Sequence, residues 1–514
     1  MNSSFLMKFD NYSVTENGAL GYEYALEPLV DFNFKVASLR NAVPRDIVKA
    51  FVRAFYADRE YAIKYLFFLR DIRGGLGERR IFRTCLKFLI DSHPDIALSV
   101  MELIPEYGRY DDLLEYVDSP LCAEACYYIK SQLHKDVEAM AAGKNVSLLA
   151  KWLPSNNTSS FETRRLARII TNNLKMSPEQ YRRVLKKLRK YLEVTETKIS
   201  RGNWNQVDYE KVPAKAGLKY DQAFAKNDGA RRKEYFKKVL DGETKLKVAG
   251  LMPYEIVHRL FGDVFVIGCK DDMLAELSWE KMIKDGYENK WGLKECIVVA
   301  DTSGSMMARA TGSQISAMEV CYSLAIYFSQ MLEGPFKNKV ITFSERPRYI
   351  DLSKGVKLKE KLEIMKAYSE VANTNIEAVF DLILKTAIDN RCRQEDLPKQ
   401  VLIVSDMEFD MARGDRTPLE PLFKTIERKF AKAGYKIPRL IFWNLCSRTE
   451  TVPMVDNEEG LCLLSGFSQN AMKVAADETK KEPYEALKQV LDSSRYEPVK
   501  KALQNAQIVV EYSS

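Results

Sequence analysis

Three polar side chains follow a short apolar run in the sequence VVADTSGSM, from Val298 to Met306. Asp301, Ser303 and Ser305 alternate along the chain, directly after what reads as a buried strand. Carboxylate and hydroxyl oxygens are the ligands that hard divalent cations prefer. The spacing therefore predicts a site for a divalent cation, Mg²⁺ first, with Mn²⁺ and Ca²⁺ as alternatives.

Two later segments add oxygen ligands to the same predicted site. Thr374 opens an expected helix in ANTNIEAVF, and Asp406 ends an expected strand in VLIVSDMEF. Ligand sites in open α/β sheets lie beyond the carboxyl ends of the strands, where these residues are expected to meet. Few of the predicted ligands are anionic, so the cation keeps positive character and an open position for a carboxylate or phosphate of a partner.

The elements that must position these residues begin near residue 291. Short apolar strands alternate there with helices, which is typical of a mostly parallel sheet covered on both faces. We therefore expect a Rossmann-like α/β domain over residues 291–514. Beyond the strand that leads to Asp301, strands are expected at 339–344, 400–406, 439–445 and 460–466, and helices at 316–332, 357–369, 375–389, 418–434 and 483–492.

The N-terminal half has a different pattern. From about residue 25 to 285, apolar residues recur at spacings of three and four, and short polar breaks separate one helix from the next. We expect an all-α domain over residues 1–290, built from HEAT-like helical repeats, although the letters show no clean repeat. The clearest helix starts at MSPEQ, where Ser177 can cap, Pro178 suits the first turn and Gln180 completes a capping box.

A basic excess lies in this helical half. Residues 181–250 hold 19 Lys and Arg against 9 Asp and Glu, with aromatic residues interleaved. Lys and Arg follow phosphates, and exposed rings stack on unpaired bases, so the region could bind RNA. The alternative is that the rings form the core and the basic face is only solvated. The candidate RNA contacts are Arg73, Arg79, Arg80, Lys151, Arg182, Arg183, Lys186, Lys187, Arg189, Lys190, Lys211, Lys215 and Lys219.

Some charged residues of the helical half also have structural interpretations. The arginines around the glycine turn at 73–80 could line the rim of a ring or form a solvated connector. Arg109, followed by Asp111 and Asp112, is expected to form a structural cluster of ion pairs and caps rather than a contact with a ligand.

The predicted metal site resembles the metal-ion-dependent adhesion site of von Willebrand factor A domains. The resemblance implies that Ser303, Ser305 and often the threonine ligate the ion, while Asp301 and Asp406 act directly or through water. One departure is Ala372-Asn373, where that family often has glycines, so the backbone of this loop is expected to differ.

The helical half resembles the TROVE-related proteins. The resemblance is carried by GRYDDLLEY at 108–116, KWLP at 151–154, the stretch at 202–224 and LMPYEIVHRL at 251–260. More closely, the whole chain is similar to a branch of that architecture, found widely outside animals, that pairs helical repeats with a C-terminal von Willebrand A domain. In the Ro ribonucleoproteins the repeats form a ring that binds small structured RNAs outside and single-stranded RNA ends in a basic hole. The resemblance implies an RNA-binding function here.

Catalysis by a serine nucleophile is not expected. His93, His134 and His258 are the three histidines of the chain, none lies in residues 291–514, and the motif G-x-S-x-G is absent. A metal-dependent hydrolase or nuclease would need a base or a second metal, and the sequence offers neither plainly. We therefore expect a protein that is not an enzyme.

Cysteines and apolar runs limit other classes. The nine cysteines are an odd number, mostly within apolar runs, and Cys122 and Cys126 lack a second pair at zinc spacing. The apolar runs are shorter than the roughly 20 residues that a membrane span needs. The N-terminus does not read as a signal peptide, so we expect a cytoplasmic chain with no membrane partner.

Taken together, the sequence predicts a non-catalytic, Ro-like RNA-binding protein. Its basic helical domain would scaffold small structured or single-stranded RNA, and its metal-bearing domain would bind a protein partner that offers an acidic residue. The alternative is a metal-dependent protein–protein adaptor that binds no RNA.

Overall fold

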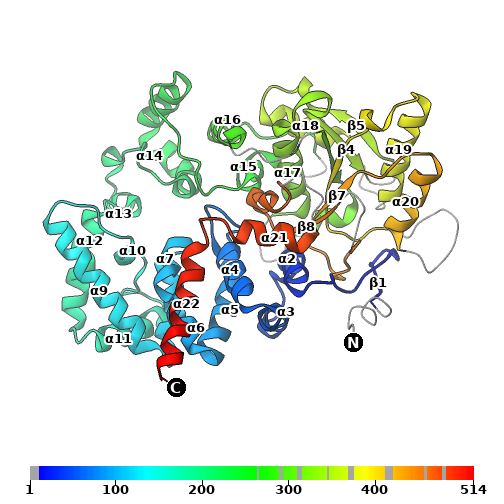
Figure 1. Ribbon diagram of the computed structural model, residues 1–514. Helices are drawn as coiled ribbons and strands as arrows, with labels where there is room; N and C mark the ends of the chain where they lie inside the picture. The colour runs from blue at the N-terminus through cyan, green and yellow to red at the C-terminus, as the bar shows by residue number, and fades with distance from the viewer. Residues whose placement is uncertain are drawn as a thin grey trace. The chain divides into compact units, whose positions relative to one another are not determined.

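The computed structural model describes residues 11–262, 266–288, 293, 295–309, 315–343, 346–368, 375–410, 421–455, 460–476 and 482–513. The chain divides into two compact units. The α/β unit joins Met1–Ala62 to Leu251–Asp492, and the helical unit joins Ile63–Gly250 to Ser493–Ser514 (Figure 1).

This division differs from the single boundary expected near residue 290, with domains 1–290 and 291–514. The reason lies in α2 (Pro28–Leu39), which is buried along nearly its whole length and packs against β7 and β8 as well as against α3. The Asn33 side-chain amide donates to the Leu463 carbonyl at 2.7 Å, and the Ala37 N–H donates to Ser465 Oγ at 2.8 Å. A helix buried on nearly all sides needs partners around it for its polar as well as its apolar side chains, and here the sheet is one of them.

A sheet of six strands forms the centre of the α/β unit, in the order β5-β4-β3-β6-β7-β8. All neighbouring strands are parallel except β5, which runs antiparallel to β4 at the edge. Every residue of β3, β6, β7 and β8 is buried, as expected for parallel strands covered on both faces. The strands are β3 (Cys296–Asp301), β4 (Lys339–Phe343), β5 (Arg348–Asp351), β6 (Gln400–Ser405), β7 (Arg439–Asn444) and β8 (Leu461–Ser465).

Helices cover both faces of this sheet, because successive side chains of a strand point to opposite sides. On one face Phe442 packs against Phe423 of α20, with ring centroids 4.7 Å apart. On the other face Trp443 packs against Phe328 of α17 at 5.4 Å. The mostly parallel, doubly covered sheet predicted from the sequence is confirmed. The α/β unit contains the helices α17 (Ala317–Met331), α18 (Leu358–Ala367), α19 (Ile376–Asp389), α20 (Leu422–Lys432) and α21 (Pro483–Leu491). It also contains α2, α3 (Pro44–Ala57), α15 (Pro253–Phe261) and α16 (Met273–Glu288).

A short hairpin brings the N-terminal residues of the described chain onto the α/β unit. The strands β1 (Ser13–Val14) and β2 (Leu20–Gly21) pair antiparallel with each other. Gly18 forms a bridge with Asp410, and Tyr22 forms one with Val452. These bridges place the hairpin beside the segments that follow β6 and β7.

The helical unit consists of successive helices joined by connections of varied length, and the expectation of helix after helix is confirmed for it. The capping box at Ser177 is present: Ser177 Oγ accepts from the Gln180 N–H at 3.1 Å, and Gln180 Oε1 accepts from the Ser177 N–H at 2.8 Å. The helices are α4 (Arg59–Arg70, shared with the α/β unit at its start), α5 (Arg80–Ser92), α6 (Pro94–Val100), α7 (Ile104–Tyr107), α8 (Leu114–Val117), α9 (Cys122–Ala141), α10 (Leu149–Trp152), α11 (Phe161–Asn173), α12 (Pro178–Tyr191), α13 (Thr195–Ser200), α14 (Ala214–Leu240, kinked at Asp228) and α22 (Glu497–Ser513).

The C-terminal helix α22 belongs to the helical unit, which the sequence did not predict. The preceding turn is held by Arg495, whose Nε donates to Asp71 Oδ2 and whose Nη1 donates to Glu106 Oε1, both at 2.8 Å. Tyr107 Oη donates to the Arg495 carbonyl at 2.6 Å, and the Tyr107 and Tyr496 rings stack at 5.7 Å. The end of the chain is therefore tied into the helical unit by polar contacts between positions almost 400 residues apart.

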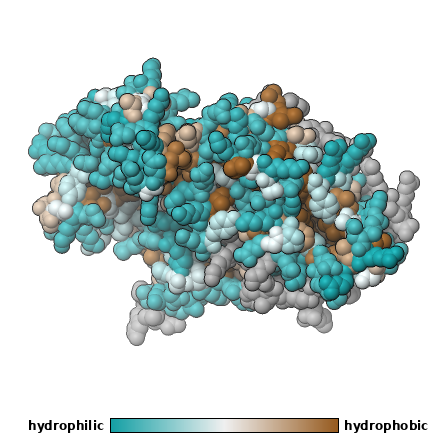
Figure 2. Space-filling model, turned by 90° about the horizontal axis from the view of Figure 1, so that it is seen from above, coloured by the Kyte–Doolittle hydropathy of each residue, from teal (hydrophilic) through white to brown (hydrophobic). Residues whose placement is uncertain are grey.

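The surface agrees with two units that bury their own apolar residues. On the face shown in Figure 2, hydrophilic residues predominate and hydrophobic residues form separate patches. Within the described residues, no helix is both long enough and apolar enough to cross a membrane.

Candidate metal centre and basic helix

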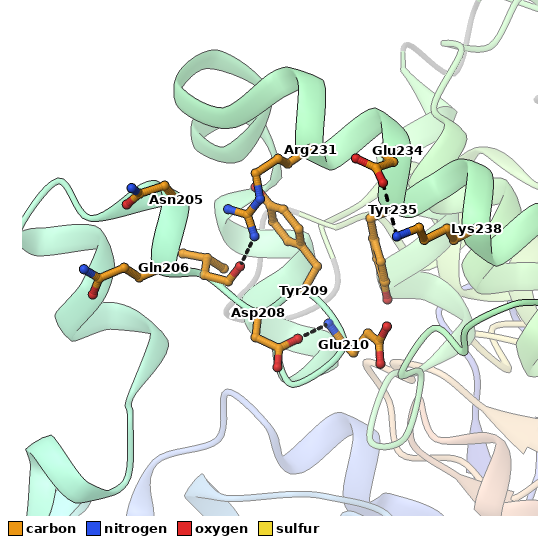
Figure 3. A pocket seen from close by; sticks show the side chains of 10 residues that line it. Asn205, Gln206, Asp208, Tyr209, Glu210, Arg231, Glu234, Tyr235 and Lys238 are labelled. Carbon is orange, nitrogen blue, oxygen red and sulfur yellow. Dashed lines mark hydrogen bonds and ion pairs between the residues drawn. The ribbon is translucent and has the colours of Figure 1, made fainter.

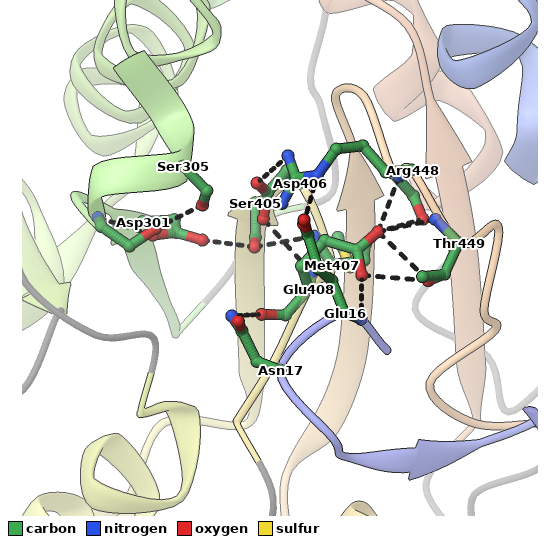
Figure 4. A network of polar contacts seen from close by, with 12 residues as sticks. Glu16, Asn17, Asp301, Ser305, Ser405, Asp406, Met407, Glu408, Arg448 and Thr449 are labelled. Carbon is green, nitrogen blue, oxygen red and sulfur yellow. Dashed lines mark hydrogen bonds and ion pairs between the residues drawn. The ribbon is translucent and has the colours of Figure 1, made fainter. Parts of the chain in front are cut away.

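The predicted metal ligands gather at the carboxyl end of the sheet. Asp301 ends β3 and Asp406 follows β6, and these two strands are neighbours, so both side chains reach the same edge. Both residues are fully buried. Asp301 Oδ2 accepts from the Ser405 hydroxyl at 2.5 Å, and its Oδ1 accepts from the Ser303 N–H at 2.9 Å (Figure 4).

The two serines connect the carboxylates. Ser303 Oγ and Ser305 Oγ lie 3.0 Å apart, and the Ser305 hydroxyl donates to the Asp406 carboxylate. Asp301, Ser303, Ser305 and Asp406 thus form one connected group of oxygens. The fifth predicted ligand, Thr374, lies outside the described residues.

The electrostatics of this group favour a bound cation. Burial, and after it the nearby charge of Asp406, together raise the pKa of Asp301 to about 7. Burial also raises the pKa of Asp406, although hydrogen bonding from Ser305 and the charge of Arg448 oppose the rise. Two buried carboxylates at one edge repel each other, and a divalent cation between them would remove both the repulsion and the desolvation cost.

The donor set fits a hard cation. All four placed side chains offer oxygen, which suits Mg²⁺, Mn²⁺ or Ca²⁺ better than a soft metal. Over the described residues, no group of three or more His, Cys, Asp or Glu side chains could hold a metal ion. Any site here therefore depends on the hydroxyls of Ser303 and Ser305 as well as on the carboxylates.

Residues that the sequence did not single out complete the surroundings. Arg448, in the loop after β7, places Nη1 3.1 Å from Asp406 Oδ2. Glu408 accepts from the N–H groups of Arg448 at 2.6 Å, Thr449 at 2.9 Å and Glu16 at 2.8 Å. Burial raises the pKa of Glu408, but these hydrogen bonds outweigh it and hold the pKa below its usual value. Glu16, Glu408, Arg448 and Thr449 thus form a hydrogen-bonded network beside Asp406 (Figure 4).

Only some residues of this hydrogen-bonded network could have been predicted from the sequence. Ser405 and Glu408 flank Asp406 in VSDMEF, and they could have been proposed from this closeness. Glu16 and Arg448 could not, because each is separated from its partners by a loop or by nearly 400 residues.

The basic face of α12 is present in the helical unit. Arg182, Lys186 and Lys190 are exposed, and together with half-buried Arg189 they line one pocket. The other two predicted contacts point elsewhere. Arg183 pairs with Glu179 at 3.0 Å, and Lys187 is exposed outside the pocket.

Several other predicted RNA contacts are engaged in ion pairs or ring contacts. Arg73 Nη1 donates to the Glu106 carbonyl at 3.1 Å, and Lys151 pairs with Glu196 at 3.5 Å. Lys211 pairs with Asp208 at 3.4 Å, and the Lys219 ammonium lies 5.1 Å from the centre of the Tyr220 ring. Arg79, Arg80 and Lys215 are exposed. For the paired residues a structural role is the simpler interpretation.

Most of the interleaved aromatic rings are core residues. Tyr181, Tyr209, Phe224 and Tyr235 are buried, so they are not free to stack on bases. Tyr191 is 38% exposed. The alternative in which the rings form the core is therefore correct for these four.

The cluster around Asp112 is structural, as expected. Asp112 is fully buried and accepts from Arg70 Nη2 at 2.8 Å and from Arg83 Nε at 2.6 Å. The Arg109 side chain pairs with Asp111 and packs over Trp152 at 4.0 Å. The cluster holds the turn between α7 and α8.

A second pocket in the helical unit is lined by both acidic and basic side chains. Glu234 pairs with Lys238 at 3.1 Å, and Arg231 Nη2 donates to the Val207 carbonyl at 2.8 Å (Figure 3). Asp208 accepts from the Glu210 N–H at 3.1 Å. Three acidic residues, Asp208, Glu210 and Glu234, line this pocket against two basic ones, Arg231 and Lys238, so it offers no net attraction for an anion.

Comparisons with known proteins give families rather than activities. A family described as "Domain of unknown function (DUF2828)" matches residues 15–118 and 125–290, which is more than half of the chain. A second, "Domain of unknown function (DUF7788)", matches residues 295–512. The chain is 30% identical over 527 residues to "Uncharacterized protein L728" of Acanthamoeba polyphaga mimivirus, covering 95% of this chain and 89% of that relative. The resemblance to TROVE-related and von Willebrand A proteins stays a prediction.

Proposed function

The chain belongs to the family of the domain of unknown function DUF2828, and from that premise we propose that it is a non-catalytic, Ro-like RNA-binding protein. The helical unit, as a HEAT-like scaffold, holds small structured or single-stranded RNA. The α/β unit is a von Willebrand A-like domain that binds a divalent cation, most readily Mg²⁺, and through it an acidic side chain of a protein partner.

The observation that carries the RNA part of the proposal is the basic face of α12. Arg182, Lys186 and Lys190 are exposed on one side of the helix, at spacings of four residues, and no ion-pair partner is found for them in the described chain. Exposed cations without acidic neighbours attract the phosphates of nucleic acid over long distances. Tyr181, Tyr209, Phe224 and Tyr235 are buried and cannot stack on bases, so contacts with phosphates are the main source of the proposed RNA affinity.

The cation part rests on the oxygens at the sheet edge. Asp301, Ser303, Ser305 and Asp406 come from two neighbouring strand ends and already contact one another. The two carboxylates balance the charge of one divalent cation, and the hydroxyls are neutral ligands that leave a coordination position for a partner's carboxylate. Without a second metal or a plain base beside the cation, this arrangement suits binding better than the activation of water. We therefore assign this unit a binding role.

The test is purification of the full chain from its native host at moderate salt. The absorbance ratio at 260 and 280 nm is read, and any nucleic acid that accompanies the protein is sequenced. A discrete small RNA is the expected result. A clean protein spectrum that persists at low salt contradicts RNA binding.

A metal-dependent adaptor without RNA is the second candidate, and the sheet-edge oxygens favour it independently of α12. The two candidates differ in what Asp301→Ala does. For the RNA-binding protein, this variant loses metal-dependent capture of a partner and keeps its RNA affinity. For the adaptor, partner capture is lost and no RNA affinity exists in either protein.

A further inference from the structure

A pocket of about 500 Å³ lies beside α12 in the helical unit. One wall is the helix face that carries Arg182, Lys186, Arg189 and Lys190, and Arg201, directly after α13, also lines the pocket. Its remaining lining is neutral, so no Asp or Glu is found among the described residues that line it. The pocket is large enough for a ligand of nucleotide size.

The acidic residues nearest along the chain are already engaged elsewhere. Glu196 pairs with Lys151 at 3.5 Å, Glu193 pairs with Lys198 at 3.1 Å, and Glu179 pairs with Arg183 at 3.0 Å. None of these three basic partners lines the pocket. The positive charge of the pocket is therefore left uncompensated by the described part of the chain.

Arg189 is a fixed donor within this pocket. Its Nε donates to the Ala150 carbonyl at 2.7 Å, its Nη2 donates to the Leu153 carbonyl at 2.8 Å, and its Nη1 donates to Ser155 Oγ at 2.8 Å. A guanidinium has five N–H donors, so two remain after these three bonds. The side chain is held in place without an acidic partner and can still donate to an anion.

The loop at 155–157, which also lines the pocket, is held in place by hydrogen bonds within the helical unit. Tyr181 Oη donates to the Pro154 carbonyl at 3.0 Å, and Asn156 Nδ2 donates to the Pro178 carbonyl at 3.2 Å. Arg164 Nη1 donates to the carbonyls of Thr158 and Ser159 at 2.6 and 2.9 Å. The wall is formed before any ligand arrives, which lowers the entropic cost of binding.

From this geometry we infer that the pocket binds a chain of linked phosphates, such as a diphosphate or triphosphate group. A single phosphate group carries at most about two negative charges at neutral pH, fewer than the five cations can neutralise. Arginine and lysine are the usual partners of phosphate oxygens. The one aromatic residue of the lining, Tyr181, is buried with its hydroxyl engaged, so no exposed ring is available to select a base.

The inference goes beyond RNA binding, because the linked phosphates can belong to a free nucleotide or to the 5′ end of an RNA. In both cases the pocket recognises the number of phosphates and not the base.

The experiment is calorimetric titration of the full chain in EDTA with inorganic phosphate, pyrophosphate, tripolyphosphate, ATP and GTP. EDTA keeps cations away from the phosphates and from the α/β unit. Affinity is expected to rise by about tenfold with each added phosphate, because each adds charge-assisted hydrogen bonds. ATP and GTP are expected to bind alike. Equal affinities for inorganic phosphate and tripolyphosphate would overturn the inference, as would binding of only one of the two nucleotides.

Matched variants separate the pocket from general basicity. Lys190→Ala and Arg201→Ala each remove one positive charge from the lining, and each should weaken tripolyphosphate binding by about tenfold. Lys187→Ala removes the same charge from an exposed position on the same helix, outside the lining, and should leave the affinity unchanged. An equal loss in all three variants contradicts a defined site.

A comparison of RNAs identifies the source of the phosphates. If an RNA with a 5′-triphosphate binds tighter than the same RNA with a 5′-hydroxyl, and Arg201→Ala removes the difference, the end of an RNA is the source. If both RNAs bind equally while tripolyphosphate binds in the pocket, a free nucleotide is the source. If tripolyphosphate binds and no RNA does, the phosphate site stands and the proposed RNA-binding function fails.

Discussion

Replacing Asp301 by Asn should stabilise the cation-free protein at pH 8 and abolish its stabilisation by Mg²⁺. The change keeps the shape of the side chain. The amide oxygen still accepts from the Ser303 N–H, and the amide nitrogen can donate to the Ser405 hydroxyl that now donates to Asp301. What is lost is one negative charge from a fully buried pair of carboxylates.

The size of the effect follows from the pKa of Asp301, which burial and the charge of Asp406 raise from 3.8 to about 7. One pKa unit corresponds to about 1.4 kcal/mol, so the ionised carboxylate destabilises the cation-free fold by at most about 4 kcal/mol. The pKa of this acid rises on folding, so the native state binds its proton more tightly than the unfolded state does. The destabilisation is therefore complete above pH 7, and it fades as the pH falls from 7 toward 4.

The assay is urea unfolding of wild type and Asp301→Asn in EDTA and in excess Mg²⁺, at pH 8 and pH 5. In EDTA at pH 8 the free energy of unfolding of the variant should exceed that of wild type by about 2 to 4 kcal/mol. At pH 5 the difference should be less than half as large. At a cation concentration 100 times the dissociation constant, wild type alone should gain about 3 kcal/mol.

The control is Asp351→Asn, the same chemical change on the edge strand β5 of the same sheet. Hydrogen bonds from Lys339 and Ser353 hold the pKa of Asp351 below its usual value, so this change should not stabilise the protein. It should also leave the Mg²⁺ effect intact. An Asp301→Asn protein that is less stable than wild type at pH 8, with the same gain from Mg²⁺, would refute the reasoning.

Three further outcomes test other parts of the account. Changing Arg182, Lys186 and Lys190 together to Ala should reduce the slope of log affinity for single-stranded RNA against log salt by about 2, and an unchanged slope removes α12 from the RNA site. Asp112→Ala leaves Arg70 and Arg83 without their buried partner and should cost about 3 to 5 kcal/mol of stability in thermal unfolding, and a loss below about 1 kcal/mol contradicts a structural cluster. The hydrogen bond to Glu319 at 2.6 Å raises the pKa of His258 above 6.5, so the pair stabilises the fold fully below pH 6.5 and less as the pH rises through the raised pKa. The melting-temperature advantage of wild type over His258→Gln should therefore shrink between pH 6 and pH 8, and a constant difference contradicts the pairing.

The local elements of the α/β unit were accessible from the sequence because each parallel strand is a short apolar run with a polar end. The expected strand at 400–406 is β6 (Gln400–Ser405), and the expected helix at 375–389 is α19 (Ile376–Asp389). The gathering of Asp301 and Asp406 followed from one rule, that parallel strands present their carboxyl ends at the same edge. No comparable rule predicts β5, a four-residue edge strand with exposed positions.

Contacts between distant segments were not accessible. α2 is buried on the sheet along nearly its whole length and donates from Asn33 to the Leu463 carbonyl, but the periodicity of the helix does not report which element it packs against. In the same way, the positions of Glu16 and Arg448 behind Asp406 depend on how three loops close, which no local pattern encodes. The basic face of α12 could be predicted, but the pocket that it forms with Arg201 requires the fold of the loop at 155–157.

The central claim is that RNA binds to the helical unit, and ultraviolet cross-linking in the native host tests it most directly. The cross-linked protein is digested, and the peptides that carry nucleotides are identified by mass spectrometry. The account predicts cross-linked peptides from residues 151–219, which contain α12 and the pocket. Cross-links confined to residues 295–512, or none above the background of an unrelated basic protein, would contradict it.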